Sequence, residues 1–181
     1  MTQHLVLDTD LGTDVDDVLA LATLLGSPEL HLDGVTTVYG DTLLRARMVS
    51  RVASVAGRAV GPVVPGRGEP RSGRPVYWAG HEGAQLENLD HEQVSSWYDA
   101  TEVLAAARTV MAIGPLTNVA EALERPDQVI QELVLMGGEF TEGRVEHNIH
   151  CDVAAASVVF AAGLPTTVIG LDQTTRIHLG K

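Results

Sequence analysis

The sequence predicts an α/β fold with an open, mostly parallel β-sheet and helices on both faces of the sheet. Short apolar runs rich in Val, Ile and Leu alternate with segments of helical period along the chain. This alternation is typical of strand–helix–strand units, which form parallel sheets. Polar residues directly follow most of the apolar runs, and such sheets bind ligands at the carboxyl ends of their strands. The sequence therefore predicts a functional site along one rim of the sheet.

The expected elements follow one another in sequence order. Strands are expected at residues 4–8, 31–38, 60–64, 109–113, 131–136 and 166–171. Helices are expected at residues 15–25, 42–56, 99–107, 115–124 and 152–162. Residues 66–98 contain repeated Gly and Pro and predict a long irregular loop. Loops of this length in a compact domain are usually functional or mobile.

Composition and charge narrow the class of protein. The chain has 181 residues, of which 45% are hydrophobic and 20% are charged, and this predicts one globular domain over residues 1–181 with a sizeable core. The formal net charge of −12 disfavours nucleic acid or an anionic membrane surface as a partner. The arginines gather on an expected helix and in the loop, and both groups are predicted to be solvated. They are Arg45, Arg47, Arg51 and Arg58, and then Arg67, Arg71 and Arg74.

The cellular location is predicted from features that the sequence lacks. Cys151 is the single cysteine, so no disulfide framework is expected and a reducing compartment is the simpler assumption. The first residues carry no basic segment, and no apolar run approaches the roughly 18 residues of a membrane span. These observations predict a cytoplasmic protein that does not cross a membrane.

The densest polar feature is a run of aspartates at the junction between the first strand and the first helix. Five of them fall within ten positions, namely Asp8, Asp10, Asp14, Asp16 and Asp17. Two unit charges about 4 Å apart repel by roughly 4 kcal/mol at an effective dielectric of about 20, whereas a helix N-terminus returns only about 0.3–1 kcal/mol per acid. A helix cap at Asp14 or Asp16 is the alternative explanation, but one cap needs one aspartate. The cluster therefore predicts a bound cation.

The chemistry of the ligands indicates which cation is expected. Asp10 and Asp17 flank a tight turn that contains Gly12, and their carboxylate oxygens suit a hard ion. Calcium accepts an irregular shell that includes backbone carbonyls, whereas magnesium demands a near-ideal octahedron. A strand-end site of aspartates and main-chain oxygens therefore favours Ca²⁺.

The run from Asp8 to Leu21, DTDLGTDVDDVLAL, resembles the signature of the nucleoside hydrolase family, the inosine-uridine-preferring N-ribohydrolases. Further segments resemble the family in the same order along nearly the whole chain. They are TTVYG at 36–40, AIGPLTN at 112–118, VLMGG at 134–138, EHNI at 146–149, CD at 151–152 and GLD at 170–172. The resemblance implies the Rossmann-like nucleoside hydrolase fold, a ribonucleoside as the substrate, and a homodimer or homotetramer.

The resemblance also implies roles for residues at the rim. Asp10, Asp17 and the main-chain carbonyl of Ile113 would bind one calcium ion, which would hold the ribose diol and the attacking water. Asp10 would be the general base on that water. The residues that would contact the substrate's sugar are Asp16, Met136, Glu146 and Asn148. The reaction would release the free base and ribose.

Some positions depart from the family pattern or match it weakly. Asp41 stands where the family usually has Asn, and it is kept as a candidate contact to the ribose 5′-hydroxyl. His81, in the expected loop, resembles the active-site loop histidine of the family. The family also has a later His-Asp pair, which serves the leaving base and the metal. No such pair follows Asp172 in this sequence, where His178 is followed by Leu179 rather than by Asp. The chain is therefore expected to be a fragment, to lack segments or to be a degenerate relative.

Two other functions stay open. A truncated relative could bind calcium and ribosides without turnover. The segment Asp8-Thr9-Asp10-Leu11-Gly12-Thr13 also superficially resembles the nucleophile motif of haloacid-dehalogenase-type phosphohydrolases. That chemistry would need a downstream lysine to neutralise the phosphate, and Lys181 is the single lysine. Phosphoryl transfer is therefore the weaker alternative.

Overall fold

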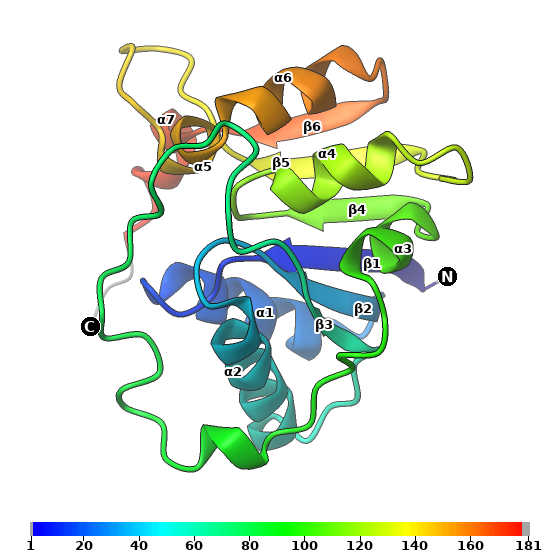
Figure 1. The fold of residues 1–181 in the computed structure, drawn as a ribbon, viewed down its shortest axis with the longest axis vertical. Helices are drawn as coiled ribbons and strands as arrows, with labels where there is room; N and C mark the ends of the chain where they lie inside the picture. Colours follow the sequence, from blue (N-terminus) through cyan, green and yellow to red (C-terminus); the bar gives the residue numbers. More distant parts are fainter. Residues whose placement is uncertain (1, 179–181) are drawn as a thin grey trace.

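A six-stranded parallel sheet forms the centre of the protein. The computed structural model describes residues 2–178. The strand order is β3-β2-β1-β4-β5-β6, and every neighbouring pair is parallel (Figure 1). The strands are β1 Gln3–Thr9, β2 Leu30–Thr37, β3 Val63–Pro65, β4 Thr109–Ala112, β5 Glu132–Met136 and β6 Thr166–Ile169. The predicted open parallel sheet is confirmed.

Helices connect and cover the strands, as the alternating pattern predicts. They are α1 Asp16–Gly26, α2 Thr42–Val55, α3 Ala100–Ala105, α4 Thr117–Leu123, α5 His147–Cys151, α6 Val153–Ala161 and α7 Leu171–Thr174, with a short 3-10 helix, η1, at Leu89–His91. Within residues 2–178, no helix combines the length and the apolar character needed to cross a bilayer.

Both faces of the sheet are packed against helices. Successive side chains of a strand point to opposite faces, so Leu5 and Leu7 of β1 join the core beneath α1 and α2. Val6, between them, joins the core beneath α3, α4 and α6. Full burial of such a side chain is worth about 1.5–3 kcal/mol, which is why β1 reads as a continuous apolar run.

The path of the chain creates a crevice at the carboxyl ends of the central strands. The chain runs outward from β1 to β2 and β3, and then returns to place β4 against the other side of β1. The helix after β1 packs on one face and the helix after β4 packs on the other, so the two connections diverge (Figure 1). Ligands bind at such a switch point in open α/β sheets.

Several expected boundaries are wrong by a few residues. The third strand, expected at 60–64, lies at Val63–Pro65, because pairing with β2 begins only at Val63. The helix expected from 115 begins at Thr117, and Leu116 is its N-cap. The elements α5, α7 and η1 were not predicted, because elements of three to five residues are too short to show a helical period. At one edge of the sheet, β6 is short and largely exposed.

Candidate active site

Residues from the ends of β1 and β4 meet at the switch point. Asp10 follows β1, and Ile113 and Gly114 follow β4, which pairs with β1 through Asp8 and Ala112. A Cβ atom at Gly114 would lie 2.9 Å from Asp10 Oδ1, so a glycine is needed for this close approach. The structure therefore places two of the predicted metal ligands, Asp10 and the Ile113 carbonyl, at neighbouring strand ends.

Asp8 is fully buried beneath this rim. Its Oδ1 accepts hydrogen bonds from Thr36 Oγ1 at 2.6 Å and from Asn118 Nδ2 at 2.9 Å. Its Oδ2 has no hydrogen-bond partner among the described residues. Burial raises the pKa of Asp8 to about 7, although the two hydrogen bonds oppose this increase. A buried carboxylate oxygen without a partner, two residues from Asp10, favours a cation or ordered water nearby.

Asp10 and Asp17 are the two carboxylates that the sequence analysis assigns to the metal. Burial raises the pKa of Asp10 to about 6, although Arg45 and His147 act to lower it. Burial and the charge of Asp10 raise the pKa of Asp17 well above its ordinary value, although Thr9 Oγ1 donates a hydrogen bond to Asp17 Oδ1. Poorly solvated acidic groups resist ionising together, and a divalent cation would relieve that cost. The oxygen donors at this rim fit a hard cation.

The other two aspartates of the run are exposed. Helix α1 begins at Asp16 with Val15 as its N-cap, and no side chain caps this end. Capping by Asp14 or Asp16 is therefore the wrong explanation of the cluster. Asp16 is solvent-exposed, and its charge acts to raise the pKa of Asp10. Asp16 therefore offers a solvent-accessible carboxylate in the first turn of α1.

The prediction of a solvated arginine is wrong for Arg45, which is 1% exposed on α2. Its guanidinium donates hydrogen bonds to the carbonyl oxygens of Asp10, Leu11 and Tyr39. Arg45 precedes the buried residues Met48 and Val49 by three and four positions, so it belongs to the apolar stripe of its helix. This spacing relative to Met48 and Val49 is the feature of the sequence that could have predicted the burial of Arg45. Arg45 holds the main chain of the aspartate run from below.

The long loop at 66–98 is tied to the aspartate run through Glu82. The buried Glu82 carboxylate accepts a hydrogen bond from Thr13 Oγ1 at 3.0 Å and others from backbone N–H groups of its own loop. His81 Nε2 lies 2.8 Å from the carbonyl oxygen of Thr13. The Trp78 ring packs on the Arg45 guanidinium at 5.0 Å. The predicted substrate residue His81 therefore does lie beside the rim, and Trp78 packs the loop down.

The predicted sugar contacts on the far side of β4 also come together. Glu146 is the N-cap of α5, and its Oε2 accepts a hydrogen bond from Gly138 N at 2.9 Å. Asn148 Nδ2 donates to the carbonyl oxygens of Ile113 at 2.8 Å and Met136 at 3.1 Å. Glu146 and Asn148 are both buried. These contacts place Asn148 at the ends of both β4 and β5, and Glu146 beside the end of β5, where Met136 is the last residue.

Asp41 has an evident local role. It is the exposed N-cap of α2, and its Oδ1 accepts a hydrogen bond from Leu44 N at 2.9 Å.

The nearby Tyr39 is buried and has a φ of 69°. This conformation is strained for a bulky residue, and such residues cluster at functional sites. Its ring meets His147 edge-on at 6.0 Å.

Two buried polar residues that were not predicted as site residues, Asn118 and Asp152, hold the loop against the sheet. Asn118 Oδ1 accepts a hydrogen bond from Arg67 N at 2.8 Å. Asp152 accepts hydrogen bonds from Thr117 Oγ1 at 2.6 Å and from the backbone N–H groups of residues 71–72 at 2.8 and 3.0 Å. Both side chains are fully buried. The four partners just named lie 35–81 residues away in sequence, so periodicity alone does not reveal these contacts.

A comparison with models of protein families shows which family the chain belongs to. Residues 5–181 match the family model described as inosine-uridine preferring nucleoside hydrolase. The chain belongs to this family. The resemblance seen in the ordered sequence motifs is therefore confirmed.

Curated members of the nucleoside hydrolase family are similar over almost the whole chain. Uridine nucleosidase 1 of Arabidopsis thaliana is 32% identical over 199 residues, covering 98% of this chain and 59% of the relative. The non-specific ribonucleoside hydrolase RihC of Salmonella newport (strain SL254) is 33% identical over 197 residues, covering 97% of this chain and 63% of the relative. The chain therefore spans about three fifths of the length of these relatives.

Solved nucleoside hydrolase structures share the fold. The purine-preferring ribonucleoside hydrolase from Gardnerella vaginalis superposes with a TM-score of 0.81 at 28% identity, covering 98% of this chain and 63% of that one. A plant nucleoside hydrolase, the PpNRh1 enzyme, superposes with a TM-score of 0.79 at 25% identity and covers 98% of this chain and 62% of that one. The nucleoside hydrolase fold of the chain is thereby established.

Proposed function

We propose that this protein hydrolyses the N-glycosidic bond of ribonucleosides and releases a free base and ribose. The observation that supports this proposal best is the pair of buried carboxylates, Asp8 and Asp10, at the switch point of a chain that belongs to the nucleoside hydrolase family. Asp17 approaches the same place from the first turn of α1. Acidic groups gathered at a sugar-binding rim suit a reaction that builds positive charge on the ribose.

We further propose that the rim takes Ca²⁺. Asp10, Asp17 and the Ile113 carbonyl would hold the ion. The carbonyl oxygen of Ile113 already accepts one hydrogen bond from Asn148, but its second lone pair is free to serve an ion. When bound, the ion would supply a positive charge that fixes the ribose diol and lowers the pKa of a water molecule.

Asp10 is the proposed general base. In the metal-free site, burial raises the pKa of Asp10 to about 6, so the carboxylate is mostly ionised at neutral pH and able to accept a proton. It would take the proton from the attacking water. As the base departs, the carboxylates around the ring would stabilise the oxocarbenium character of the ribose in a poorly solvated cleft.

The remaining rim residues are proposed to bind the sugar. Asn148 donates hydrogen bonds to the carbonyl oxygens of Ile113 after β4 and Met136 at the end of β5, and Glu146 lies beside Gly138, just after β5. Asp16 is exposed next to Asp10 and would reach a ribose hydroxyl from the opposite side. The additional proposed contacts, from α2 and the long loop, are Asp41 and His81.

A base-release assay tests this function. The chain is incubated with a panel of purine and pyrimidine ribonucleosides, with calcium or with a chelator, and the free base is measured. We expect release to require the metal and to fall by about 10²–10⁴-fold in Asp10→Asn, as expected for loss of a general base. The matched control is Asp14→Asn, which alters an exposed aspartate of the same run and should leave the rate near wild type. A folded Asp10→Asn protein with wild-type turnover would refute the role of Asp10.

A second candidate is binding of calcium and ribosides without turnover. The observation that favours it is that the residues proposed to hold the ion and the sugar lie together at the rim and would serve binding as well as hydrolysis. Calorimetry that detects a riboside, together with no base release, would support this candidate. The family match favours hydrolysis and riboside binding over phosphoryl transfer, whose candidate lysine, Lys181, lies outside the described residues.

We also propose a single domain over residues 1–181, a cytoplasmic location, and a homodimer or homotetramer.

A further inference from the structure

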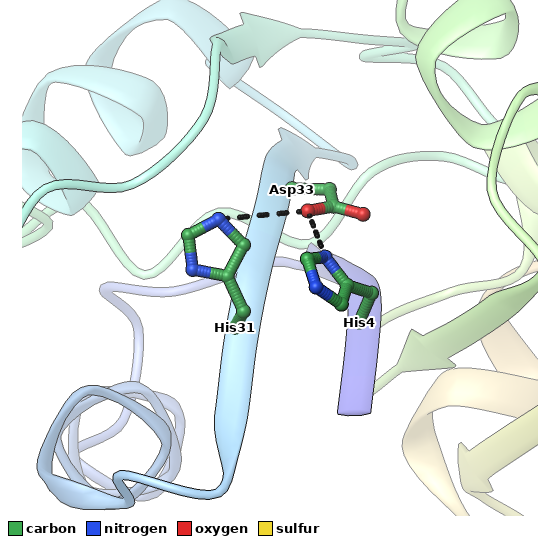
Figure 2. A group of neighbouring side chains, drawn as sticks. All are labelled: His4, His31 and Asp33. Atoms are coloured by element: carbon green, nitrogen blue, oxygen red, sulfur yellow. Dashed lines mark hydrogen bonds and ion pairs between the residues drawn. The ribbon is translucent and has the colours of Figure 1, made fainter. Parts of the chain in front are cut away.

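Two histidines and an aspartate converge at the end of the sheet opposite the proposed active site. His4 lies near the start of β1, and His31 and Asp33 lie near the start of β2 (Figure 2). His4 and His31 are direct partners in the parallel pairing of the two strands. The proposed nucleoside site lies at the other ends of these strands, so this cluster is separate from it.

An irregularity in β2 contributes to the arrangement. Leu5 pairs with Leu32, but the next residue, Val6, pairs with Gly34, so Asp33 is an extra residue in β2. Such bulges redirect a side chain locally and are common next to functional sites. Here one oxygen of the Asp33 carboxylate faces both imidazole rings, as Figure 2 shows.

The potential ligand atoms point toward one another. His4 Nδ1 lies 2.7 Å from Asp33 Oδ1, and His31 Nε2 lies 3.6 Å from the same oxygen. The ligand atoms of the three side chains all lie within 4.8 Å of one another. A tetrahedral zinc ion with bonds of about 2.0–2.1 Å holds its ligands about 3.3 Å apart, a value between the two measured separations.

We propose that His4, His31 and Asp33 bind a divalent transition-metal ion of the zinc class. Two imidazole nitrogens and one carboxylate oxygen are a common protein ligand set for zinc, and a water molecule would complete the shell. The three side chains are 47–59% exposed, so an ion can enter from solvent. Hard ions such as calcium prefer an all-oxygen shell, which distinguishes this site from the proposed rim site.

A simple surface ion pair does not account for the geometry as well. One carboxylate oxygen faces two histidines, and exposed ion pairs add little stability by themselves. His91 and Asp90 show what an ordinary exposed pair looks like in this protein. They lie 3.6 Å apart, and within residues 2–178 no third ligand joins them to form a metal-type cluster.

Zinc titration tests the proposal. The chain is stripped with a chelator and dialysed into excess Ca²⁺, which fills an oxygen-rich site without competing for imidazole, and Zn²⁺ binding is then measured by calorimetry. We expect one tight Zn²⁺ per chain. Substituting His4→Ala, His31→Ala or Asp33→Ala should each weaken binding by about tenfold or more, because loss of a mere supporting residue already costs about 10–100-fold. The control His91→Ala should bind zinc as the wild type does.

The side chains are exposed, so the variants should fold, and circular dichroism checks this. Co²⁺ supplies a second readout, since a four-coordinate site gives it a characteristic visible absorption that His31→Ala should abolish. The proposal is wrong if the wild type binds no zinc in calcium, or if His31→Ala binds it unchanged. It is equally wrong if binding is lost in Cys151→Ser, whose sulfur lies 3.4 Å from His147. None of these outcomes depends on nucleoside hydrolysis.

Discussion

At the scale of single residues, the unusual feature of the rim is a buried cation of the protein's own. Arg45 donates to three main-chain carbonyls, and its positive charge acts to lower the pKa of Asp10 and Asp17. Burial of the guanidinium lowers the pKa of Arg45 itself, although the nearby carboxylates oppose this. The arginine thus shapes the aspartate run and offsets part of its charge.

Replacing Arg45 should weaken the fold. Arg45→Met keeps the length of the side chain but leaves buried carbonyls without donors, each of which costs about 1–3 kcal/mol. We therefore expect the free energy of unfolding, measured in urea, to fall by at least about 1 kcal/mol. The matched control is Arg58→Met, at an exposed position beyond the end of α2, which should behave like wild type. Equal stability of the two variants would contradict the structural role of Arg45.

At the scale of elements, the long loop is held by helix ends rather than by a core of its own. Asp152 caps α6 through Ala155 N and also accepts hydrogen bonds from Thr117 and from residues 71–72. One buried carboxylate therefore joins α4, α6 and the loop. Glu82 makes the corresponding connection to the aspartate run.

Removing the Asp152 carboxylate should release the loop. Hydrogen bonds to a charged group are worth about 1.5–3 kcal/mol each, and a lost helix cap costs about 0.5–2 kcal/mol. Asp152→Ala should therefore lower the free energy of unfolding by about 3 kcal/mol or more and speed proteolysis near residues 66–74. Asp127→Ala, at an exposed carboxylate that pairs with Arg125, is the control and should remain near wild type. An unchanged cleavage rate in Asp152→Ala would refute this anchoring role.

The elements also show what sequence patterns can and cannot reveal. The order of strands and helices was predictable, because β1 and its neighbours are buried on both faces and read as apolar runs. The aspartates at the end of β1 were recognisable as a candidate site, because their number exceeds what a helix cap needs. The burial of Arg45 and the contacts of Asp152 were not predicted. They depend on partners brought together by tertiary packing, such as residues 71–72 beside α6.

At the scale of the whole molecule, the buried acids link stability to pH and metal. The ordinary pKa of 3.8 rises to about 7 for Asp8 and about 6 for Asp10 in the folded state. Between pH 3.8 and the raised pKa of each group, the unfolded chain releases a proton that the folded chain keeps. The contribution of both groups to stability is therefore fully present below pH 3.8 and is lost as the pH rises through about 6–7.

We expect calcium to reverse this loss. When a chelator keeps the protein free of metal, the contribution of Asp8 and Asp10 should make the melting temperature lower at pH 8 than at pH 5. Added Ca²⁺ should raise the melting temperature more at pH 8 than at pH 5, since the ion binds only the deprotonated carboxylates. Asp17→Asn should largely remove the calcium effect. A calcium effect that is absent at both pH values, or that is retained in Asp17→Asn, would contradict the proposed rim site.

The outer margin of β6 has a practical consequence for handling this protein. Within the described residues no strand pairs with that margin, and the strand itself is mostly exposed. Unpaired backbone groups in such a position are a template for strand addition from another molecule. Concentrated preparations of the chain should therefore aggregate through this strand, and a charged substitution at the exposed Thr167 should suppress that aggregation.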